Sequence, residues 1–564
     1  MKAQVKTAAQ QPYFDQRWFI RSMEILPGAV TWLTLLLPIL LSVVEPVSVA
    51  YFIIAYDLYW MIKSFRLSAN LLRGYRRLHV AQTIDWNKRL AGLSTLNKDL
   101  AQNALQISQM REANPSLRNR LNFGNRQVAK KYQMLVTEGE RLKTLVAKAD
   151  KIFDPDKIYH AVVLATYNES MDTLWPSVKS LTEVAFPLEQ LMLVIAYEER
   201  GGARTEENAL KLVEEFGDKF AMCIAVKHPD GVAGEVRGKG GNISHAGRVL
   251  TEEVRKRGID PEQVVVTTFD SDHRSSKNYF SYLSYLYATD EDRVRRSYQP
   301  IPMFYNNIWD VPAPMRVIAT GNSFWMLMEA MRPHRLRNFA AHAQSLAGLI
   351  KTDYWSVTSI VEDGHQYWRS YFAFEGDHNV VPVFTPIYQD AVLANTYART
   401  FAVQFLQLRR WAWGVSDFPY VVRQSLAHKK IAWGNKLPQI GRLFESHFSW
   451  ATAPLILTFV GWLPLYLNRD FGYQSLAHNL PIITSRILTL SSLAIVTTVL
   501  LSLLSLPPKP ARYHKTRFVG MLVQWALLPV VSIGFSALAA LNSQTRLMFG
   551  RYLEFYVTEK ATRK

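Results

Sequence analysis

Cysteine is almost absent from this sequence. The 564 residues contain a single cysteine, Cys223. A disulfide within the chain is therefore excluded, and so is a zinc site built from several thiolates. Because Cys223 lies in the apolar run 220–226, we expect it to be a small core residue.

Acidic residues are also scarce compared with basic ones. The chain has 65 Lys and Arg against 47 Asp and Glu, a formal net charge of +18. Such a balance is typical of proteins that meet nucleic acid or an anionic membrane. The basic clusters stand beside long apolar runs, which favours membrane lipids as partners and argues against nucleic acid.

Charge is missing or rare in five long stretches, which predict membrane-spanning helices. They are residues 26–44, 47–62, 450–467, 487–506 and 518–541. The second contains Asp57 and the fifth contains Pro529. Two paths stay open for the fifth stretch, a full crossing or a re-entrant hairpin; Pro529 favours the hairpin, which keeps the basic tail on the cytoplasmic side.

Basic residues follow the second stretch and precede the fifth. By the positive-inside rule these ends are cytoplasmic. The sequence thus predicts an integral protein of a bacterial inner (plasma) membrane with a cytoplasmic catalytic domain. We divide it into an N-terminal segment with two spans (1–65), a helical linker or collar (66–150), a catalytic domain (151–414), interfacial amphipathic helices (415–448), a C-terminal transmembrane region (449–545) and a basic tail (546–564).

Strand and helix patterns alternate from residue 160 onward. Strands are predicted at 160–166, 191–196 and 221–226 and in the run ending at Asp270; helices are predicted at 171–183, 204–216 and 242–257. This alternation is typical of a mostly parallel sheet covered on both faces, a nucleotide-binding architecture. A helical, aromatic region from about 275 to 375 is expected to carry the rest of the cleft.

Two carboxylates end the last of these strands. Asp270 and Asp272 fall at its C-terminal edge, on the same side of an extended chain. There they can hold Mg²⁺ or Mn²⁺ and connect it to a diphosphate. The alternative is an acidic turn that caps the next helix.

Two polar turns precede this strand. Tyr167, in the segment 165–169, can lie against a flat base, or the segment is an ordinary turn. Lys239 stands among glycines at the start of a helix and can meet a phosphate. The pattern is not a P-loop, since Ala233 stands where the first glycine is needed, so a flexible turn is the alternative.

Two further motifs follow. Glu362 and Asp363 form an acidic pair, in which Asp363 can take a proton from an attacking hydroxyl and Glu362 can orient it. Gln407 and Arg410 share a helix face, and Trp411 offers a flat surface to a sugar ring. A solvated surface pair and a basic juxtamembrane helix are the respective alternatives.

In this order, between predicted spans, the five motifs resemble those of the family 2 membrane glycosyltransferases, the cellulose, chitin and hyaluronan synthases and their relatives. The resemblance covers roughly residues 155–545. It implies a GT-A domain, an α/β fold with a mostly parallel sheet, inserted between transmembrane helices. It also implies a nucleotide-diphospho-sugar donor, most simply a UDP-sugar, and Mg²⁺ or Mn²⁺ as cofactor.

The resemblance also implies roles for single residues. Asp272 and Asp270 would hold the metal, and Asp363 would be the catalytic base. The donor would be bound by Thr166, Tyr167, Glu169, Glu198, Lys239, Asp270 and Ser271. The diphosphate and the acceptor would be bound by Gly321, Asn322, Ser323, Glu362, Gln407, Arg410 and Trp411, the first three in an acceptor-contacting loop. Two positions depart from the family pattern, with Glu198 in place of Asp and Val361 in place of Thr.

Three functions stay open. The leading one is an inverting transferase that extends a β-linked polysaccharide and exports it through its own helices. A second is transfer of one sugar to a lipid carrier, against which the Gln-x-x-Arg-Trp motif argues. A third is a degenerate domain that serves as scaffold or export channel. The acceptor is thus a glycan or a lipid-linked group, accessory export proteins stay open as partners, and the sugar and linkage are not readable.

Overall fold

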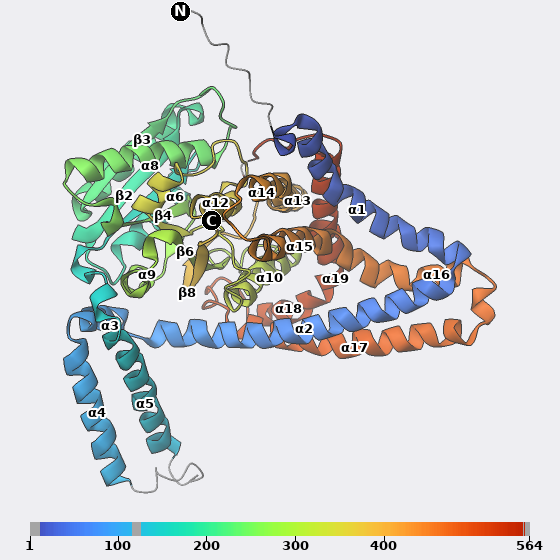
Figure 1. Cartoon of the computed structure of the whole chain (residues 1–564), viewed down its shortest axis with the longest axis horizontal. Helices are drawn as coiled ribbons and strands as arrows, with labels where there is room; N and C mark the ends of the chain where they lie inside the picture. Colours follow the sequence, from blue (N-terminus) through green and yellow to red (C-terminus); the bar gives the residue numbers. More distant parts are fainter. Residues whose placement is uncertain (1–11, 115–125, 557, 559–564) are drawn as a thin grey trace, which may run out of the picture.

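The chain forms an α/β domain on one side and a group of long helices on the other (Figure 1). The computed structural model describes residues 12–114, 126–556 and 558. Helix α2 (Pro46–Thr83) runs from the far end of the helical group to the α/β domain.

One mixed sheet of eight strands forms the centre of the α/β domain. Its order is β3-β2-β1-β4-β7-β6-β8-β5, and β1 pairs in parallel with both β2 and β4. Pairs β2–β3 and β6–β8 are also parallel, whereas the pairings of β7 and β5 are antiparallel. The predicted fold class, a mostly parallel α/β sheet accompanied by apolar helices, is confirmed. The strands are β1 (Tyr159–Thr166), β2 (Leu191–Glu198), β3 (Met222–His228), β4 (Val264–Asp270), β5 (Arg274–Ser275), β6 (Arg296–Met303), β7 (Ala343–Ser345) and β8 (Asn379–Tyr388).

Both faces of the sheet are buried because successive side chains of each strand enter different cores. On β1, Val162 and Leu164 join one apolar core, while Ala161 and Val163 join the other. Helices α6 (Met171–Thr182), α7 (Ala203–Phe216) and α9 (Tyr279–Thr289) contribute to the first core, and α8 (Lys239–Lys256) and α11 (Leu346–Lys351) to the second. The β-branched, apolar strands predicted up to Asp270 therefore lie where their composition requires, within a few residues of the predicted ends.

The region 275–375 is less helical than predicted. It contains β6 and β7, and β6 pairs with β8, which follows it by about eighty residues. Pro300 and Pro302 interrupt the local strand pattern of β6. Its strand conformation depends on distant partners, which local propensity does not reveal. Besides α11, the α-helices between Met303 and Trp433 are α10 (Ala313–Ala330), α12 (Glu362–Ala373), α13 (Tyr397–Ala412) and α14 (Asp417–Ala427).

Four helical segments are long and apolar enough to cross a membrane. They are α1 (Arg17–Val44), Trp433–Leu467 with α15 (Trp433–Phe459) and α16 (Leu463–Leu467), α17 (Ser475–Leu504), and Arg517–Met548 with α18 (Arg517–Val523), α19 (Leu528–Val531) and α20 (Leu538–Met548). The second predicted span, 47–62, lies in α2, which is not among these four in the described part of the chain. Its apolar run is short and includes Asp57, and the helix continues through basic residues to Thr83.

The predicted turn at Pro529 is wrong, but the tail lies against the α/β domain, the side on which the hairpin would keep it, because Phe555 packs against Gly238. The chain stays helical from Arg517 to Met548, with 3₁₀ and π-helical turns on either side of α19. Pro529 lies in the first turn of α19, where a missing N–H breaks no helical hydrogen bond.

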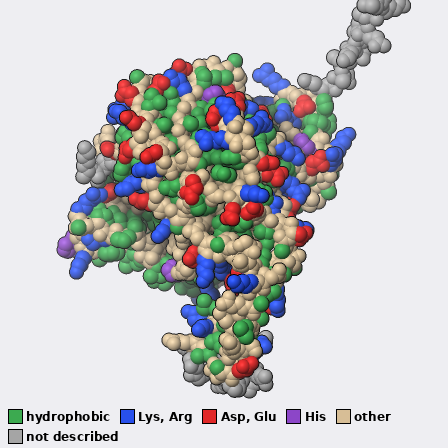
Figure 2. Space-filling model, turned by 90° about the vertical axis from the view of Figure 1, so that its left-hand side faces the viewer, with side chains coloured by type: hydrophobic (Ala, Val, Ile, Leu, Met, Phe, Trp, Pro, Cys, Tyr) green, Lys and Arg blue, Asp and Glu red, His purple; other side chains and the backbone are tan. Residues whose placement is uncertain are grey.

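Residues before the α/β domain form further helices. Trp86 in α3 (Trp86–Ala91) stacks on Tyr282 of α9, with ring centroids 3.7 Å apart. This contact packs α3 against α9. Helices α4 (Leu96–Ala113) and α5 (Arg126–Val146) extend away from the domain (Figure 1). On the face of the α/β domain that points away from the apolar helices, acidic and basic side chains are intermixed (Figure 2).

Candidate active site

The parallel strands bring the predicted donor residues to one edge of the sheet. Ala165 of β1 lies opposite Asp270 of β4, and Thr166 lies opposite Tyr197 of β2. Thr166, Glu198 and Asp270 therefore leave three neighbouring strands at the same edge, where open α/β sheets bind ligands.

A candidate metal site follows β4. Ligand atoms of Asp270, Asp272 and His273 all lie within 4.8 Å of one another. Asp272 Oδ2 also accepts a hydrogen bond from the backbone N–H of Asp390 at 2.8 Å. Paired carboxylates at this spacing fit Mg²⁺ or Mn²⁺, which prefer oxygen ligands.

His273 is a member of this site that the sequence reasoning missed. Its Nδ1 accepts the backbone N–H of Asp270 at 3.1 Å, and its Nε2 lies 3.5 Å from Asp270 Oδ2. A neutral ring that accepts at Nδ1 carries its proton on Nε2. His273 thus orients the Asp270 carboxylate and in this arrangement offers no free lone pair to a metal.

Lys239 connects the two acidic motifs. Its Nζ lies 2.5 Å from Asp270 Oδ1 and 4.0 Å from Glu362 Oε1. Burial lowers the pKa of Lys239, but Asp270 and Glu362 outweigh burial and hold the pKa above its ordinary value. The ammonium therefore stays charged and joins the end of β4 to the start of α12.

The glycines around Lys239 allow this close packing. A Cβ added to Gly240 would lie 2.2 Å from the carbonyl oxygen of Ser356, and one on Gly241 would lie 2.3 Å from Glu235 Oε2. The start of α8 could not approach these segments with larger residues. These two glycines place Lys239 between the acidic groups.

Glu362 and Asp363 occupy the first turn of α12, where the helix dipole favours negative charge. Burial and the neighbouring Asp363 raise the pKa of Glu362 to about 7. Burial also raises the pKa of Asp363, against the opposing effects of Lys239 and Arg410. A carboxylate with a raised pKa accepts a proton more readily, which suits a general base.

Helix α13 supplies further groups to the candidate site. Arg410 is near enough to lower the pKa values of both Glu362 and Asp363. Its buried Nε has no hydrogen-bond partner among the described residues. The Trp411 ring lies 6.3 Å from the Phe304 ring, between centroids.

The segment after β6 joins this side to the metal site. Phe304 contacts Trp411, and Asn306 Nδ2 donates to the backbone carbonyl of Asp272 at 3.0 Å. Residues 304–306 thus connect Asp272 to Trp411. The charges of Asp270, Lys239 and Arg410 all act on the pKa of Asp363.

The remaining donor candidates lie in tightly bonded turns. Glu169 Oε2 accepts from the Thr166 hydroxyl and from the Tyr167 N–H, both at 2.8 Å, and so closes the turn after β1. The Arg200 guanidinium lies 4.4 Å from the centre of the Tyr167 ring and pairs with Glu198. Arg200, which had no predicted role, therefore connects the two candidates.

Two predicted side chains are buried. Ser271 is 2% exposed, and its carbonyl accepts from the Ser177 hydroxyl at 2.7 Å. Ser323 is fully buried; it bonds the Ala319 carbonyl at 3.3 Å and accepts from the Phe304 N–H at 3.4 Å.

The segment predicted to be an acceptor-contacting loop is helical instead. Gly321, Asn322 and Ser323 lie in the middle of α10. The flanking Met, Leu and Ala residues are good helix formers, and one glycine costs a helix only about 1 kcal/mol. Gly321 and Asn322 are half-buried.

The C-terminal tail also reaches this cleft, which the sequence reasoning did not foresee. The Arg410 guanidinium lies 4.8 Å from the centre of the Phe555 ring, and Phe555 also packs against Gly238. Gln407 Nε2 donates to Thr558 Oγ1 at 3.4 Å. The available signal was the adjacent pair of aromatic residues, Phe555 and Tyr556, in a tail that also contains basic residues.

Comparisons with known proteins give similarities in structure only. No protein-family model matches the chain, and no curated protein matches it. Among solved structures, a mannosyltransferase from Pyrobaculum calidifontis in complex with GDP-Man and Mn²⁺ is similar at a TM-score of 0.35 and 13% identity, over 67% of this chain and 87% of that one. S. aureus TarS (residues 1–349) in complex with UDP-GlcNAc is similar at a TM-score of 0.30 and 13% identity, over 70% and 93%. GalNAc-T7 with UDP, GalNAc and Mn²⁺ is similar at 0.27 and 11%, over 54% and 58%.

Proposed function

We propose that this chain is a membrane glycosyltransferase of the family 2 type that transfers a sugar from a nucleotide-diphospho-sugar with inversion. The observation that carries the proposal is the single ammonium of Lys239, which lies between Asp270 and Glu362. This ammonium connects the two-carboxylate metal site to the buried acidic pair. The charge of the Arg410 guanidinium also acts on that pair.

On the donor side, Asp270 and Asp272 would hold the metal. Bound there, Mg²⁺ or Mn²⁺ supplies positive charge to the diphosphate of the leaving group. Arg410 has an unused buried donor and can bind the same diphosphate. Thr166, Tyr167 and Glu198 at the sheet edge, with the buried Ser271, surround the place for the nucleoside.

On the acceptor side, Asp363 takes the proton. The acceptor oxygen forms a bond to the anomeric carbon while the bond to the diphosphate oxygen breaks, and the hydroxyl proton passes to the Asp363 carboxylate. One displacement inverts the configuration at that carbon. Trp411 offers a flat apolar face to the acceptor sugar, and Gln407 lies one turn before it on α13.

We further propose that the acceptor is a growing β-linked polysaccharide that leaves through the apolar helices. Trp411, which follows Arg410 on α13, favours a sugar acceptor over a lipid carrier. The complete set of acidic groups argues against a degenerate scaffold. The size of the product separates the first two functions, because a processive enzyme yields long chains and a lipid-carrier enzyme yields a single glycolipid.

The test uses the full chain in detergent with a panel of radiolabelled UDP- and GDP-sugars and Mg²⁺ or Mn²⁺. We expect Asp363→Asn to lower turnover about 10²- to 10⁴-fold with donor affinity unchanged, because only the proton acceptor is lost. The exposed Asp218→Asn is the matched control and should leave turnover unchanged. Substantial transfer by Asp363→Asn would remove the assigned role.

A further inference from the structure

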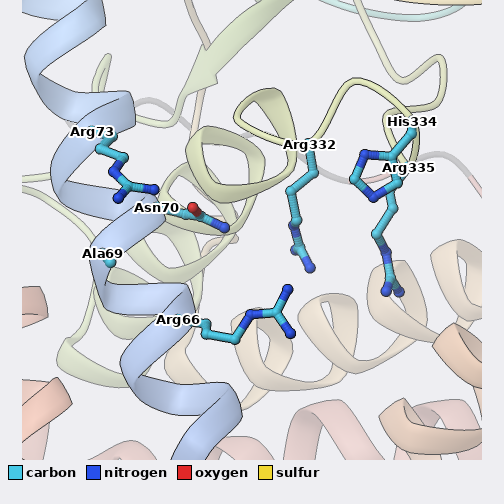
Figure 3. A pocket seen from close by; sticks show the side chains of 7 residues that line it. All are labelled: Arg66, Ala69, Asn70, Arg73, Arg332, His334 and Arg335. Carbon is cyan, nitrogen blue, oxygen red and sulfur yellow. The ribbon is translucent and has the colours of Figure 1, made fainter.

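A basic cavity lies away from the cleft, between α2 and the segment that follows α10. Its volume is about 380 Å³, and it is lined by Arg66, Ala69, Asn70, Arg73, Arg332, His334 and Arg335. Figure 3 shows the first four on one wall, from α2, and the last three on the other. We refer to it as the arginine cavity.

The cations of this cavity are incompletely neutralised. Arg332 pairs with Glu329, and Arg335 pairs with Glu445 Oε2 at 2.8 Å. Glu445 also pairs with Lys63, so it serves two cations. Among the described residues, neither Arg66 nor Arg73 has an ion pair.

The two walls direct like charges toward one another. The guanidinium groups of Arg66 and Arg332 point into the space between the walls (Figure 3). Burial lowers the pKa of Arg332, and Arg335 and Arg66 add to this effect by repulsion. An anion between the walls would remove this repulsion, and guanidinium groups suit phosphate oxygens because they donate in pairs.

The surroundings are apolar on the side of the long helices. Ser68 of α2 donates to the Ala494 carbonyl of α17 at 3.3 Å, so the two helices touch at the level of the cavity. Phe65 and Leu72 of α2 are exposed there, as are Leu493 and Val496 of α17. Helix α17 is one of the four helices apolar enough to cross a membrane.

We propose that the arginine cavity binds the phosphate of an anionic membrane lipid, whose acyl chains lie along α2 and α17. Arg66 and Arg73, which have no ion pair among the described residues, can neutralise the phosphate charge. The exposed apolar side chains favour a lipid over a free anion. The site is independent of the proposed sugar transfer, since none of its residues belongs to the cleft.

The test is a competition in native mass spectrometry. The full chain in neutral detergent is incubated with equal amounts of phosphatidylglycerol and phosphatidylcholine that carry the same acyl chains. We expect preferential retention of phosphatidylglycerol, and a loss of about 25-fold in its affinity for Arg66→Gln/Arg73→Gln, since each basic residue near an anionic lipid contributes about fivefold.

The matched control is Arg76→Gln/Lys98→Gln, which removes two exposed charges outside the cavity and should keep the preference. Arg66→Lys/Arg73→Lys, which retains the charge, should recover most of the binding and guards against misfolding of the glutamine variant. Equal retention of both lipids by the unmodified chain, or equal loss in the control, overturns the proposal.

A second arm adds inorganic phosphate or diphosphate without lipid. Arginine-dependent binding of these anions, combined with no preference for phosphatidylglycerol, would assign the cavity to a soluble anion and overturn the lipid source. Displacement of bound phosphatidylglycerol only at high salt supports it, because phosphate–arginine contacts are screened by salt.

Discussion

The strand side and the helix side of the candidate site are built differently. On the strand side, several polar groups have a partner close in sequence: Glu169 bonds Thr166 and Tyr167, His273 faces Asp270, and Arg200 pairs with Glu198. On the helix side, some partners come from the far end of the chain. Gln407 reaches a residue 151 positions away, and Phe555 covers Arg410.

This difference indicates that the strand side is preorganised and the helix side is conditional. Short local contacts hold Glu169 and Glu198 in place, whereas Asp270 and Asp272 also depend on Lys239 and on the Asp390 N–H. Arg410 and Gln407 receive their final surroundings only when the tail lies against α13. Substitutions on the two sides should therefore fail in different ways, and three experiments, from the largest expected effect to the smallest, examine this contrast.

The largest effect is expected at the metal site. Asp272→Asn, or EDTA added to the unmodified chain, should lower transfer about a thousandfold or more, because the leaving diphosphate loses its main counter-charge. Calorimetry with Mn²⁺ measures the loss of metal binding. Release of labelled nucleotide measures the loss of transfer. Mn²⁺ or Mg²⁺ should restore the EDTA-treated chain but not the variant. Full activity in EDTA would contradict a role for metal on the strand side.

A smaller effect is expected at Arg410. Arg410→Gln should lower turnover about 10²- to 10³-fold, the cost of one lost transition-state donor. It should also shift the acid limb of the pH–rate profile to higher pH, because the Arg410 charge lowers the pKa of Asp363 and its loss raises that pKa further. The base is active only when deprotonated, so activity falls as pH falls through this value.

Two variants sharpen that measurement. Arg410→Lys keeps the charge and should keep the position of the acid limb while turnover stays low. The neighbouring Arg409→Gln should change neither quantity. An unshifted limb in Arg410→Gln would separate Arg410 from the acidic pair and remove the electrostatic link across the cleft.

The smallest effect is expected at the tail. Phe555→Ala removes a ring that covers the Arg410 guanidinium, a contact worth about 0.5–1 kcal/mol, so the donor KM should fall about two- to fivefold. Initial rates at varied donor concentration measure it. Phe549→Ala, which removes an exposed ring from the same tail, is the control and should leave KM unchanged. A higher KM in Phe555→Ala would mean that the ring helps to hold the donor.

The same contrast explains what could be predicted from the sequence. The strands up to Asp270 and the helices between them are local patterns of Val, Ile and Thr against polar turns, and they were predicted within a few residues. The grouping of Asp270, Asp272 and Lys239 followed because parallel strands end at one edge. The roles of the site residues remain predictions, as does the family 2 assignment.

The features that were not predicted depend on distant partners. Strand β6 exists because β8 pairs with it, and Gly321 is helical because α10 is packed along its length. The position of Phe555 depends on Gly238, more than three hundred residues earlier. The hairpin at Pro529 was predicted from one proline, whose position in the first turn of α19 made it harmless.

The shared ammonium of Lys239 has a consequence for the order of binding. Near it stand four carboxyl groups, on Asp270, Asp272, Glu362 and Asp363, against two cations, Lys239 and Arg410. A nucleotide that arrives alone brings more negative charge to a place already rich in it. We therefore expect the divalent ion to bind first and the sugar nucleotide second, so that each ligand binds next to charge of the opposite sign.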